Sequence, residues 1–281
     1  MNIIGIGSAG CKITQEFEEY AQYDTYYVDT ENSYNETKNF VKVQEQPTHE
    51  EYEKNYKPLS ELKNISGETV LIVAGSGNIS GIVLSLLEQL KKEKLIVLYI
   101  KSDDFTASEE AAIKEKIVFG VLQQYARSNL IERLYIVSNT SVESVLGGAT
   151  IVDYWKNINK VISSTYHMLN VFENTEPLLT SLSEPRETNR IATLGVVAFK
   201  NLDEKTFYDL QKPRLKKYFF GISEATLNEE KDLLQKIRVY IKSKSEEKCT
   251  ACFAVYSTNY EQDYAYVVQY ASLIQEQNLD S

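Results

Sequence analysis

Residues 2–20, NIIGIGSAGCKITQEFEEY, run from an apolar stretch through three glycines into a segment of helical character. Gly5, Gly7 and Gly10 have the G-x-G-x-x-G spacing of a strand-to-helix turn, in which the backbone and the helix N-terminus face a phosphate group. By itself this turn favours a dinucleotide-binding fold. Asp29 lies 19 positions after Gly10, at the end of the next predicted strand, where an acid would bind the ribose of a dinucleotide.

A second glycine-rich turn lies in residues 70–83, VLIVAGSGNISGIV, again between an apolar strand and a predicted helix. Gly75, Gly77 and Gly81 relieve steric crowding, so that successive backbone N–H groups can face an anion. A dinucleotide site needs one such loop. Two loops at the same end of one parallel sheet therefore favour a triphosphate held between them.

The first half of the chain alternates strands and helices, which is typical of a doubly wound parallel sheet covered on both faces. Such sheets bind ligands outside the carboxyl ends of their strands. We therefore expect an α/β nucleotide-binding domain over residues 1–149, with its site in the strand-to-helix turns. Strands are predicted at residues 1–7, 25–30, 40–44, 68–77, 94–102 and 132–139, and helices at residues 11–22, 80–93 and 108–128.

A long central helix is predicted over residues 150–172, because apolar residues recur there at helical spacing. After a polar stretch with prolines, residues 173–281 are predicted to form a smaller α+β domain with a four-stranded sheet. The apolar residues of the central helix are Ile151, Trp155, Ile158, Val161 and Ile162. In the last domain, strands are predicted at residues 190–199, 218–225, 249–257 and 264–274, and a short helix is the alternative for residues 264–274. A helix is predicted at residues 228–243, and partly helical structure at residues 204–216.

The composition is that of a globular protein, with 281 residues of which 43% are hydrophobic and 25% charged. The net charge of −10 disfavours nucleic-acid binding through the overall field, and no direct nucleic-acid signature is present. No apolar run approaches the ~20 residues of a membrane span, and no cleavable signal precedes the first strand, so we expect a cytoplasmic protein. Cys249 and Cys252 lack the second half of a zinc site and are expected in the core.

Both glycine-rich turns resemble one known family. Residues 7–13, GSAGCKI, resemble the first phosphate loop of the tubulin/FtsZ family of GTPases. Residues 74–81, AGSGNISG, resemble a degenerate copy of its glycine-rich signature, G-G-G-T-G-[ST]-G. Ile79 replaces a glycine of that signature, which removes an easily reached positive φ and adds bulk near a phosphate. The matching residues are Gly75, Gly77, Ser80 and Gly81, and the other departures are Ser76 and Asn78.

The loops after the next strands resemble the family in the same order along the chain. VDTENS, at residues 28–33, resembles a loop whose acids lie near magnesium and the phosphates, with Asp29 and Glu31 as the counterparts. VLYIKSDDFTASEEAA, at residues 97–112, resembles the strand and sugar-binding loop that follow the signature. This resemblance implies a Mg²⁺ ion near Asp29 and Glu31, bound through water.

Two asparagines follow in positions that the family uses to bind the nucleotide. LYIVSNTSVESV, at residues 134–145, resembles the next strand and loop, in which Asn139 would contact the nucleotide. NINKVIS, at residues 157–163, resembles the central-helix segment in which an asparagine, here Asn159, reads guanine. An amide can pair with the mixed donor and acceptor edge of that base.

The segment after the central helix resembles the family's catalytic loop. LNVFENTEPLLTSLSEPR, at residues 169–186, resembles a loop that carries an acid into the nucleotide pocket of the next subunit, where the acid polarises the attacking water. Glu176 is the first candidate, since it follows Thr175 as in the family's T-E pair. Glu173 is the second, because Glu173-x-x-Glu176 resembles the paired acids of bacterial members. A carboxylate at this place would position the water.

The resemblance covers nearly the whole chain and implies a GTPase that binds GTP or GDP with Mg²⁺ and polymerises head to tail into cytoskeletal filaments. The implied partners are further copies of the chain and a DNA-segregation or positioning adaptor. In length the chain is similar to the short tubulins of bacteriophages and plasmids. The residues implied to contact the nucleotide are Gly7, Ser8, Ala9, Gly10, Cys11, Asp29, Glu31, Gly75, Ser76, Gly77, Asn78, Ile79, Ser80, Gly81, Asn139 and Asn159.

Two alternatives stay open. The departures at Asn78 and Ile79 motivate a protein of the same fold that acts as a scaffold without hydrolysing, or without binding, nucleotide. The first glycine-rich turn and Asp29 also fit an NAD-dependent oxidoreductase, which has no use for the second loop, for Asn159 or for Glu176.

Overall fold

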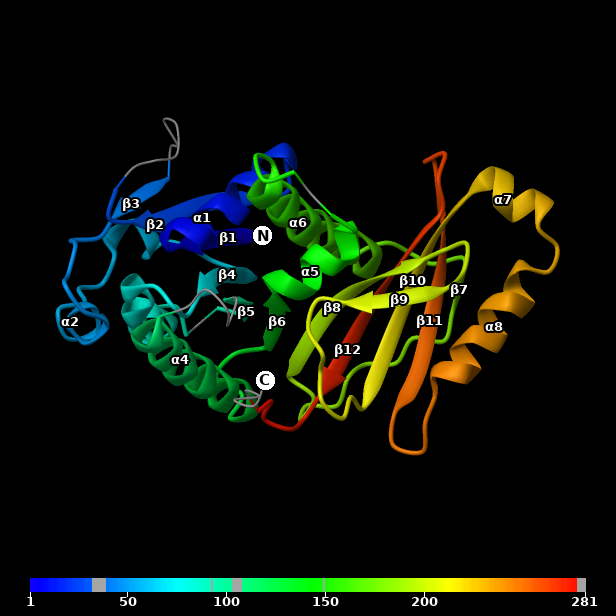
Figure 1. Cartoon of the computed structure of the whole chain (residues 1–281). Helices are drawn as coiled ribbons and strands as arrows, with labels where there is room; N and C mark the ends of the chain where they lie inside the picture. The colour runs from blue at the N-terminus through cyan, green and yellow to red at the C-terminus, as the bar shows by residue number, and fades with distance from the viewer. Residues whose placement is uncertain (32–38, 92, 103–107, 149, 277–281) are drawn as a thin grey trace.

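The computed structural model describes residues 1–31, 39–91, 93–102, 108–148 and 150–276 (Figure 1). Its first half contains β1 (Asn2–Ile6), α1 (Gly7–Gln15), the 3₁₀ helix η1 (Glu16–Glu19), β2 (Asp24–Asp29), β3 (Phe40–Lys42), α2 (His49–Lys54), η2 (Ser60–Leu62), β4 (Thr69–Ala74), η3 (Asn78–Ile82), α3 (Val83–Gln89), β5 (Leu95–Lys101), α4 (Glu109–Arg127), β6 (Arg133–Ser138) and α5 (Asn139–Leu146). Its second half contains α6 (Tyr154–Glu173), β7 (Leu179–Thr180), β8 (Ile191–Ala198), β9 (Asp203–Thr206), β10 (Leu215–Ser223), α7 (Glu224–Glu229), α8 (Leu233–Lys244), β11 (Thr250–Thr258) and β12 (Tyr264–Ala271).

The first six strands form a parallel sheet in the order β3-β2-β1-β4-β5-β6. All their carboxyl ends therefore meet at one edge, which confirms the predicted doubly wound sheet. The strand order reverses between β1 and β4, and a ligand site of such a sheet lies at this switch point. Both glycine-rich turns follow these two strands, so the topology brings them together.

Helices cover both faces of this sheet because residues within each strand alternate between two cores. On β4, Val70 and Ile72 face a core that includes α1, α5 and α6, while Leu71 and Val73 face a core that includes α3 and α4. Buried strands with apolar residues on both faces are typical of parallel sheets. Within the described part of the chain, no helix is long and apolar enough to cross a membrane.

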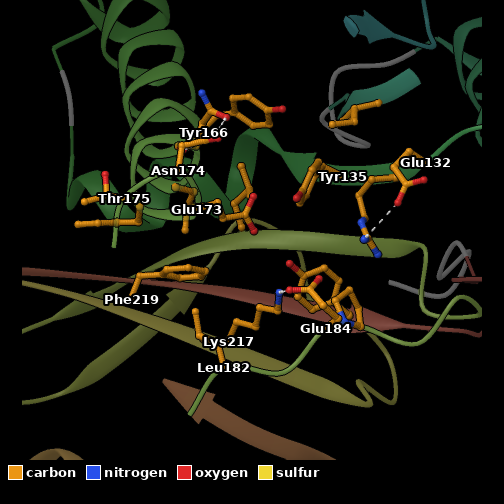
Figure 2. A pocket seen from close by; sticks show the side chains of 18 of the residues that line it. Glu132, Tyr135, Tyr166, Glu173, Asn174, Thr175, Leu182, Glu184, Lys217 and Phe219 are labelled. Carbon is orange, nitrogen blue, oxygen red and sulfur yellow. Dashed lines mark hydrogen bonds and ion pairs between the residues drawn. The ribbon is translucent and has the colours of Figure 1, made fainter. Parts of the chain in front are cut away.

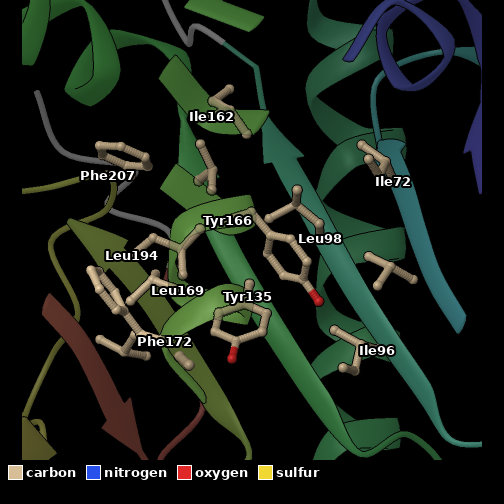
Figure 3. Close-up of a cluster of buried hydrophobic side chains, with 14 of the residues drawn as sticks. Ile72, Ile96, Leu98, Tyr135, Ile162, Tyr166, Leu169, Phe172, Leu194 and Phe207 are labelled. Carbon is tan, nitrogen blue, oxygen red and sulfur yellow. The ribbon is translucent and has the colours of Figure 1, made fainter. Parts of the chain in front are cut away.

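The central helix α6 has 20 residues and is therefore ~30 Å long. Its apolar stripe packs against both halves of the sheet, with Ile162 and Tyr166 near β5 and β6 and with Phe172 near β10 (Figure 3). The stripe begins at Tyr154, four residues before Ile158, and Tyr154 packs against this core.

The prediction that Ile151 and Trp155 belong to the apolar face of the central helix is wrong. The helix begins at Tyr154, so Ile151 lies in the preceding turn and is 95% exposed. Trp155 follows the buried stripe by one position, which turns its ring away from the core and leaves it 57% exposed. The only tryptophan of the chain therefore lies on the surface, one turn before Asn159.

The second half contains the predicted four-stranded sheet, in the order β8-β12-β10-β11, with β9 added beside β8 and β7 beside β11. Helix α8 packs on one face of this sheet, and α6 reaches the other. Residues 264–271 form a strand, β12, as the alternation predicted. Cys249 and Cys252 are buried and not disulfide-bonded, as expected of core residues.

Residues 204–216 are not partly helical, contrary to the prediction. Asp203–Thr206 pairs with β8 as β9, and β10 begins at Leu215. Pro213 disfavours helical geometry at the residue before it, and the open edge of β8 offers backbone hydrogen bonds to β9. The division into domains at residues 1–149, 150–172 and 173–281 stays a prediction, since β6 and β8 also pair at two positions and join the two sheets.

Candidate nucleotide site

The first glycine-rich turn leads from β1 directly into α1. Gly7 has a φ of 67°, a left-handed conformation that favours glycine. A Cβ at Gly10 would lie 2.3 Å from the carbonyl oxygen of Ile72, so glycine lets α1 pack on the backbone of β4. Ile6, the N-cap residue of α1, makes no side-chain capping hydrogen bond, and the N-terminus of a helix favours an anion.

The exposure of residues 7–11 indicates which of them could contact a ligand with a side chain and which only with the backbone. Ser8 and Ala9 are exposed at the start of α1, while Gly7 and Gly10 are buried. The thiol of Cys11 is buried and donates to the carbonyl of Gly5 at 3.3 Å. Cys11 can therefore serve a ligand through its backbone and not through its sulfur.

The second glycine-rich turn forms the 3₁₀ helix η3, and its polar side chains bind the protein. The Ser80 hydroxyl donates to the carbonyl oxygens of Gly75 at 3.0 Å and Gly77 at 2.7 Å. The Asn78 amide donates to the carbonyl of Pro47 at 3.0 Å. Ser76 accepts a hydrogen bond from the Ser102 hydroxyl at 2.7 Å. A phosphate at this turn would therefore be bound by backbone N–H groups rather than by these side chains.

The two turns are in contact, and Ile79 makes that contact. Its Cγ2 lies 2.7 Å from the position that a Cβ on Gly7 would take. Gly81 packs against α2, since a Cβ there would lie 2.2 Å from the carbonyl oxygen of His49, whereas Gly77 is exposed with no atom within 4 Å of its Cβ position. Ile79 thus fills the space between the loops, at a position where the resemblance implied a glycine.

A lysine that the sequence did not single out lies beside the second turn. Lys114 of α4 donates to the side-chain oxygen of Asn78 at 2.6 Å and to Glu110 at 2.9 Å. Its side chain is mostly buried, so its charge acts close to η3. In the sequence it is one of several charges on a predicted amphipathic helix, and nothing in the spacing distinguishes it.

The two candidate base-binding asparagines lie on helices in contact with each other. Asn139 is the first residue of α5, at the carboxyl end of β6, and Asn159 lies in the second turn of α6. Tyr154 of α6 donates to Glu143 of α5 at 3.0 Å. Both asparagines are half-buried, and neither side chain makes a hydrogen bond to another described residue. Their amides are therefore available to a base.

Trp155 adds an aromatic face to Asn159. The two residues are four positions apart on α6 and so lie on the same side of the helix. An exposed indole beside an unpaired amide can stack on a base while the amide reads its edge. The helical spacing of Trp155 predicted a core position for it. The one feature of the sequence that could have pointed to a binding role is that Trp155 is the sole tryptophan.

The predicted metal site has few protein ligands. Asp29 lies half-buried at the end of β2, where its carboxylate accepts from the N–H of Thr30 at 2.8 Å, and Glu31 is exposed. Among the described residues, no group of three or more His, Cys, Asp or Glu could hold a metal ion. A Mg²⁺ ion here would need water and phosphate oxygens for most of its ligands. Asn32 and Ser33, and residues 103–107 of the predicted sugar-binding loop, lie outside the described residues.

Comparison with known proteins identifies the fold. No protein-family model matches the chain, and no curated protein does. A GTPγS-form protofilament of TubZ from Bacillus thuringiensis serovar israelensis matches with a TM-score of 0.73 and 14% identity, over 98% of this chain and 87% of that one. The chain has the tubulin/FtsZ fold. GTPγS-bound CetZ2 from Haloferax volcanii (TM-score 0.69, 13% identity, 96% and 92% covered) and an FtsZ dimer from M. jannaschii (0.68, 12%, 96% and 87%) match as well.

In this tubulin/FtsZ fold, Glu173 and Glu176 lie at the other end of α6 from the candidate base site. Glu173 is the last residue of α6, 14 positions after Asn159, or about 21 Å along the helix. It lines a cavity together with Glu68, Lys94 and Glu132, which immediately precede β4, β5 and β6. These acids therefore lie at the amino ends of the strands, while the glycine-rich turns lie at the carboxyl ends.

The loop that carries Glu176 is held on both sides. At the end of α6, the Thr175 hydroxyl donates to the carbonyl of Val171 at 2.7 Å. On the other side, the N–H of Leu178 donates to the carbonyl of Val255 in β11 at 2.8 Å. Pro177 favours an extended backbone at Glu176. Glu176 is exposed and makes no hydrogen bond or ion pair with another described residue, so the loop presents it to the outside.

Proposed function

We propose that the chain binds GTP, polymerises head to tail, and completes GTP hydrolysis at the contact between subunits. The observation that carries this proposal is the separation of the glycine-rich turns from Glu173 and Glu176 by the length of α6. Acids at that distance cannot reach the turns of their own chain. They can reach a nucleotide of a neighbour stacked in the same orientation.

The similar structures support two parts of the proposal, guanine-nucleotide binding and polymerisation. TubZ was solved as protofilaments in GTPγS and GDP forms, and CetZ2 as a GTPγS-bound protofilament. A contact between opposite ends of identical subunits is heterologous, and its repetition gives an open filament. The identities of 12–14% concern the fold alone, so the residues of this chain must carry the rest of the argument.

The residues at the carboxyl edge fit a guanine nucleotide. The N-terminus of α1 and the backbone of residues 75–81 would offer N–H groups to the phosphates, and Lys114 adds positive charge beside η3. Trp155 and Asn159 offer a stacking face and an amide to the base. Mg²⁺, when bound, would neutralise charge on the phosphates, and Asp29 and Glu31 would hold it through water.

The exposed carboxylate of Glu176 would orient the attacking water in the neighbouring pocket and accept its proton. Water-positioning groups of this kind contribute about 10²–10⁴-fold to a rate. Hydrolysis would then be slow in the monomer, whose own pocket lacks the acid, and faster in the filament. The hydrogen bonds of Thr175 and Leu178 on either side hold the loop that presents Glu176 at the surface of the subunit.

A second candidate is a scaffold of the same fold without hydrolysis. The contact of Ile79 with Gly7 favours it, because a branched apolar side chain occupies space between the two phosphate loops. In that case the chain would assemble without dependence on GTP.

The test is to follow pelleting and phosphate release with GTP, GDP, NAD or no nucleotide over a series of protein concentrations. The proposal expects GTP-dependent pelleting above a critical concentration, with phosphate release that accompanies it. A Glu176→Gln variant should pellet with GTP but release phosphate at least about 100-fold more slowly. Assembly indifferent to GTP would support the scaffold, and binding of NAD without assembly would refute both candidates.

A further inference from the structure

Two exposed apolar side chains follow each other in the turn before α6. Ile151 and Val152 are 95% and 93% exposed, and neither packs against a buried cluster of the fold. Burial of branched aliphatic side chains is strongly favourable, and apolar side chains that gather at one place on a surface are typical of interaction sites. Folding of the single chain buries neither residue. We call this pair the apolar turn.

The apolar turn lies at the same end of α6 as the candidate base site. It connects α5 to α6, the two helices that carry Asn139 and Asn159. Trp155, the exposed residue proposed to stack on the base, follows Val152 by three positions. A neighbouring molecule that approaches the nucleotide site therefore meets the apolar turn as well.

An apolar groove lies beside the loop that carries Glu176, past the other end of α6. Glu173 and Thr175, both labelled in Figure 2, mark the end of the helix and the start of this loop. The chain then passes to the second sheet, where β7 begins at Leu179 and pairs with β11. The groove lies between β7, β10, β11 and the helices α7 and α8, which Figure 1 shows beside the second sheet. Its volume is about 300 Å³.

The lining of this groove suits aliphatic side chains. Eight of its ten lining residues are aliphatic. Leu178 is 63% exposed, Leu179 and Leu234 are partly exposed, and the buried side chains of Ile222 and Val255 also line the groove. An apolar cavity of ~150 Å³ holds a molecule as large as benzene, so a groove of twice that volume has room for two aliphatic side chains.

The charges next to the apolar turn match those of the groove. Asp153 and Lys156 are exposed beside the turn, and Glu230 and Lys231 are the charged residues that line the groove. Lys231 can therefore pair with Asp153, and Glu230 with Lys156, across a contact. Glu230 forms an ion pair with Lys236 at 3.0 Å, but both side chains are exposed, so this pair contributes little and leaves Glu230 able to exchange partners.

We propose that the apolar turn of one subunit inserts into the apolar groove of the next and forms the apolar centre of the head-to-tail contact. The inference rests on the proposed function, which brings Glu176 of one subunit to the nucleotide site of its neighbour. The occupant is a second copy of the chain, because the groove adjoins Glu176 and the turn adjoins the nucleotide site, so the same contact brings them together. Apolar side chains at the centre of an interface contribute most of its affinity, whereas flanking charges set the orientation.

Cysteine cross-linking tests the contact directly, because the three native cysteines are buried. Val152→Cys and Leu178→Cys subunits are mixed with GTP and treated with a short thiol-to-thiol cross-linker. We expect a cross-linked dimer in the mixture and at least about tenfold less of it in either variant alone, since the contact joins unlike surfaces. Val239→Cys is the matched control for the groove, because Val239 is exposed on α8 but does not line the groove. A yield no higher than with this control, at every protein concentration, would overturn the inference.

Sedimentation measures what the contact contributes to assembly. Val152→Asp and Leu178→Asp should each raise the critical concentration with GTP at least about tenfold, because each leaves a charge in an apolar contact. Both side chains are exposed in the single chain, so the urea midpoints should equal that of the wild type. Val239→Asp should keep the wild-type critical concentration. A mixture of the Val152→Asp and Leu178→Asp subunits retains one intact turn and one intact groove, so we expect dimers without filaments in sedimentation velocity.

The outcomes distinguish this inference from the proposed function. Wild-type critical concentrations in both aspartate variants refute the inference, while GTP-dependent assembly and hydrolysis stand. Cross-linking and loss of assembly that do not depend on GTP uphold the contact and refute the proposed function. A wild-type chain that does not assemble, together with cysteine variants that do not cross-link with any nucleotide, refutes both. A variant whose urea midpoint falls is replaced by Ile151→Asp or Leu234→Asp in the same measurements.

Discussion

Replacement of Gly10 by alanine tests how the first glycine-rich turn is built. The added Cβ would lie 2.3 Å from the carbonyl oxygen of Ile72, while ordinary contact begins at 3.4 Å, so α1 must retreat from β4 by about 1 Å. Overpacking of this kind costs about 1–3 kcal/mol, and the better helix propensity of alanine returns up to about 1 kcal/mol. We expect a net loss of about 1–2 kcal/mol in the free energy of unfolding, and weaker GTP binding because the N-terminus of α1 moves.

Urea unfolding followed by circular dichroism measures this change, and Gly120→Ala is the matched control. Gly120 also lies inside a helix, but nothing lies within 4 Å of its Cβ position. Without a clash, alanine there should stabilise the chain by about 0.5–1 kcal/mol. The two substitutions are thus expected to have opposite signs. A Gly10→Ala variant as stable as the Gly120→Ala variant would refute the close packing of α1 on β4.

Three further predictions concern the loops, the base and the second sheet. Ile79→Gly should raise the affinity for GTP, measured by titration calorimetry, about tenfold, which is equivalent to about 1.4 kcal/mol. An unchanged affinity would show that Ile79 does not obstruct the phosphates. Asn159→Ala should weaken GTP binding by about 1–3 kcal/mol in the same assay while leaving the urea midpoint unchanged, since the amide bonds to no described residue. Burial raises the pKa of Glu204, but hydrogen bonds from Lys244 and Tyr218 outweigh it and hold the pKa below 4.5. The carboxylate therefore stabilises the fold fully above about pH 4.5, and this stabilisation is lost as the pH falls through its folded pKa. Glu204→Gln should lower the free energy of unfolding by about 1–3 kcal/mol at pH 7. In acid, the free energies of unfolding of the variant and the wild type should converge, as measured by urea unfolding across pH.

The sequence was informative where local pattern and topology coincide. Gly7, Gly10, Gly75, Gly77 and Gly81 mark strand-to-helix turns. A doubly wound sheet brings such turns to one edge, regardless of the length or sequence of the segments between them. The order of the motifs along the chain therefore predicted the fold and the side of the sheet on which the candidate site lies. The resemblance of residues 169–186 to the family's catalytic loop placed Glu173 and Glu176 after the central helix, and the structure has Glu173 as the last residue of α6.

The sequence was less informative where long-range packing decides. Trp155 has the spacing of a core residue, and only the start of α6 at Tyr154 turns it outward. Residues 204–216 have helical character, yet the edge of β8 binds Asp203–Thr206 as a strand. Glu173 and Lys217 line the same cavity although they are 44 positions apart, because sheet pairing that no local pattern encodes brings β10 near the end of α6.

The most direct test of the central claim is the rate of phosphate release per subunit, measured with GTP over a dilution series of the wild-type chain. Because Glu176 would act on the nucleotide of a neighbour, we predict almost no release below a critical concentration and a steep rise in the rate per subunit above it, in step with pelleting. A rate per subunit that is the same at all concentrations would contradict the claim, since hydrolysis would then be completed within a single subunit.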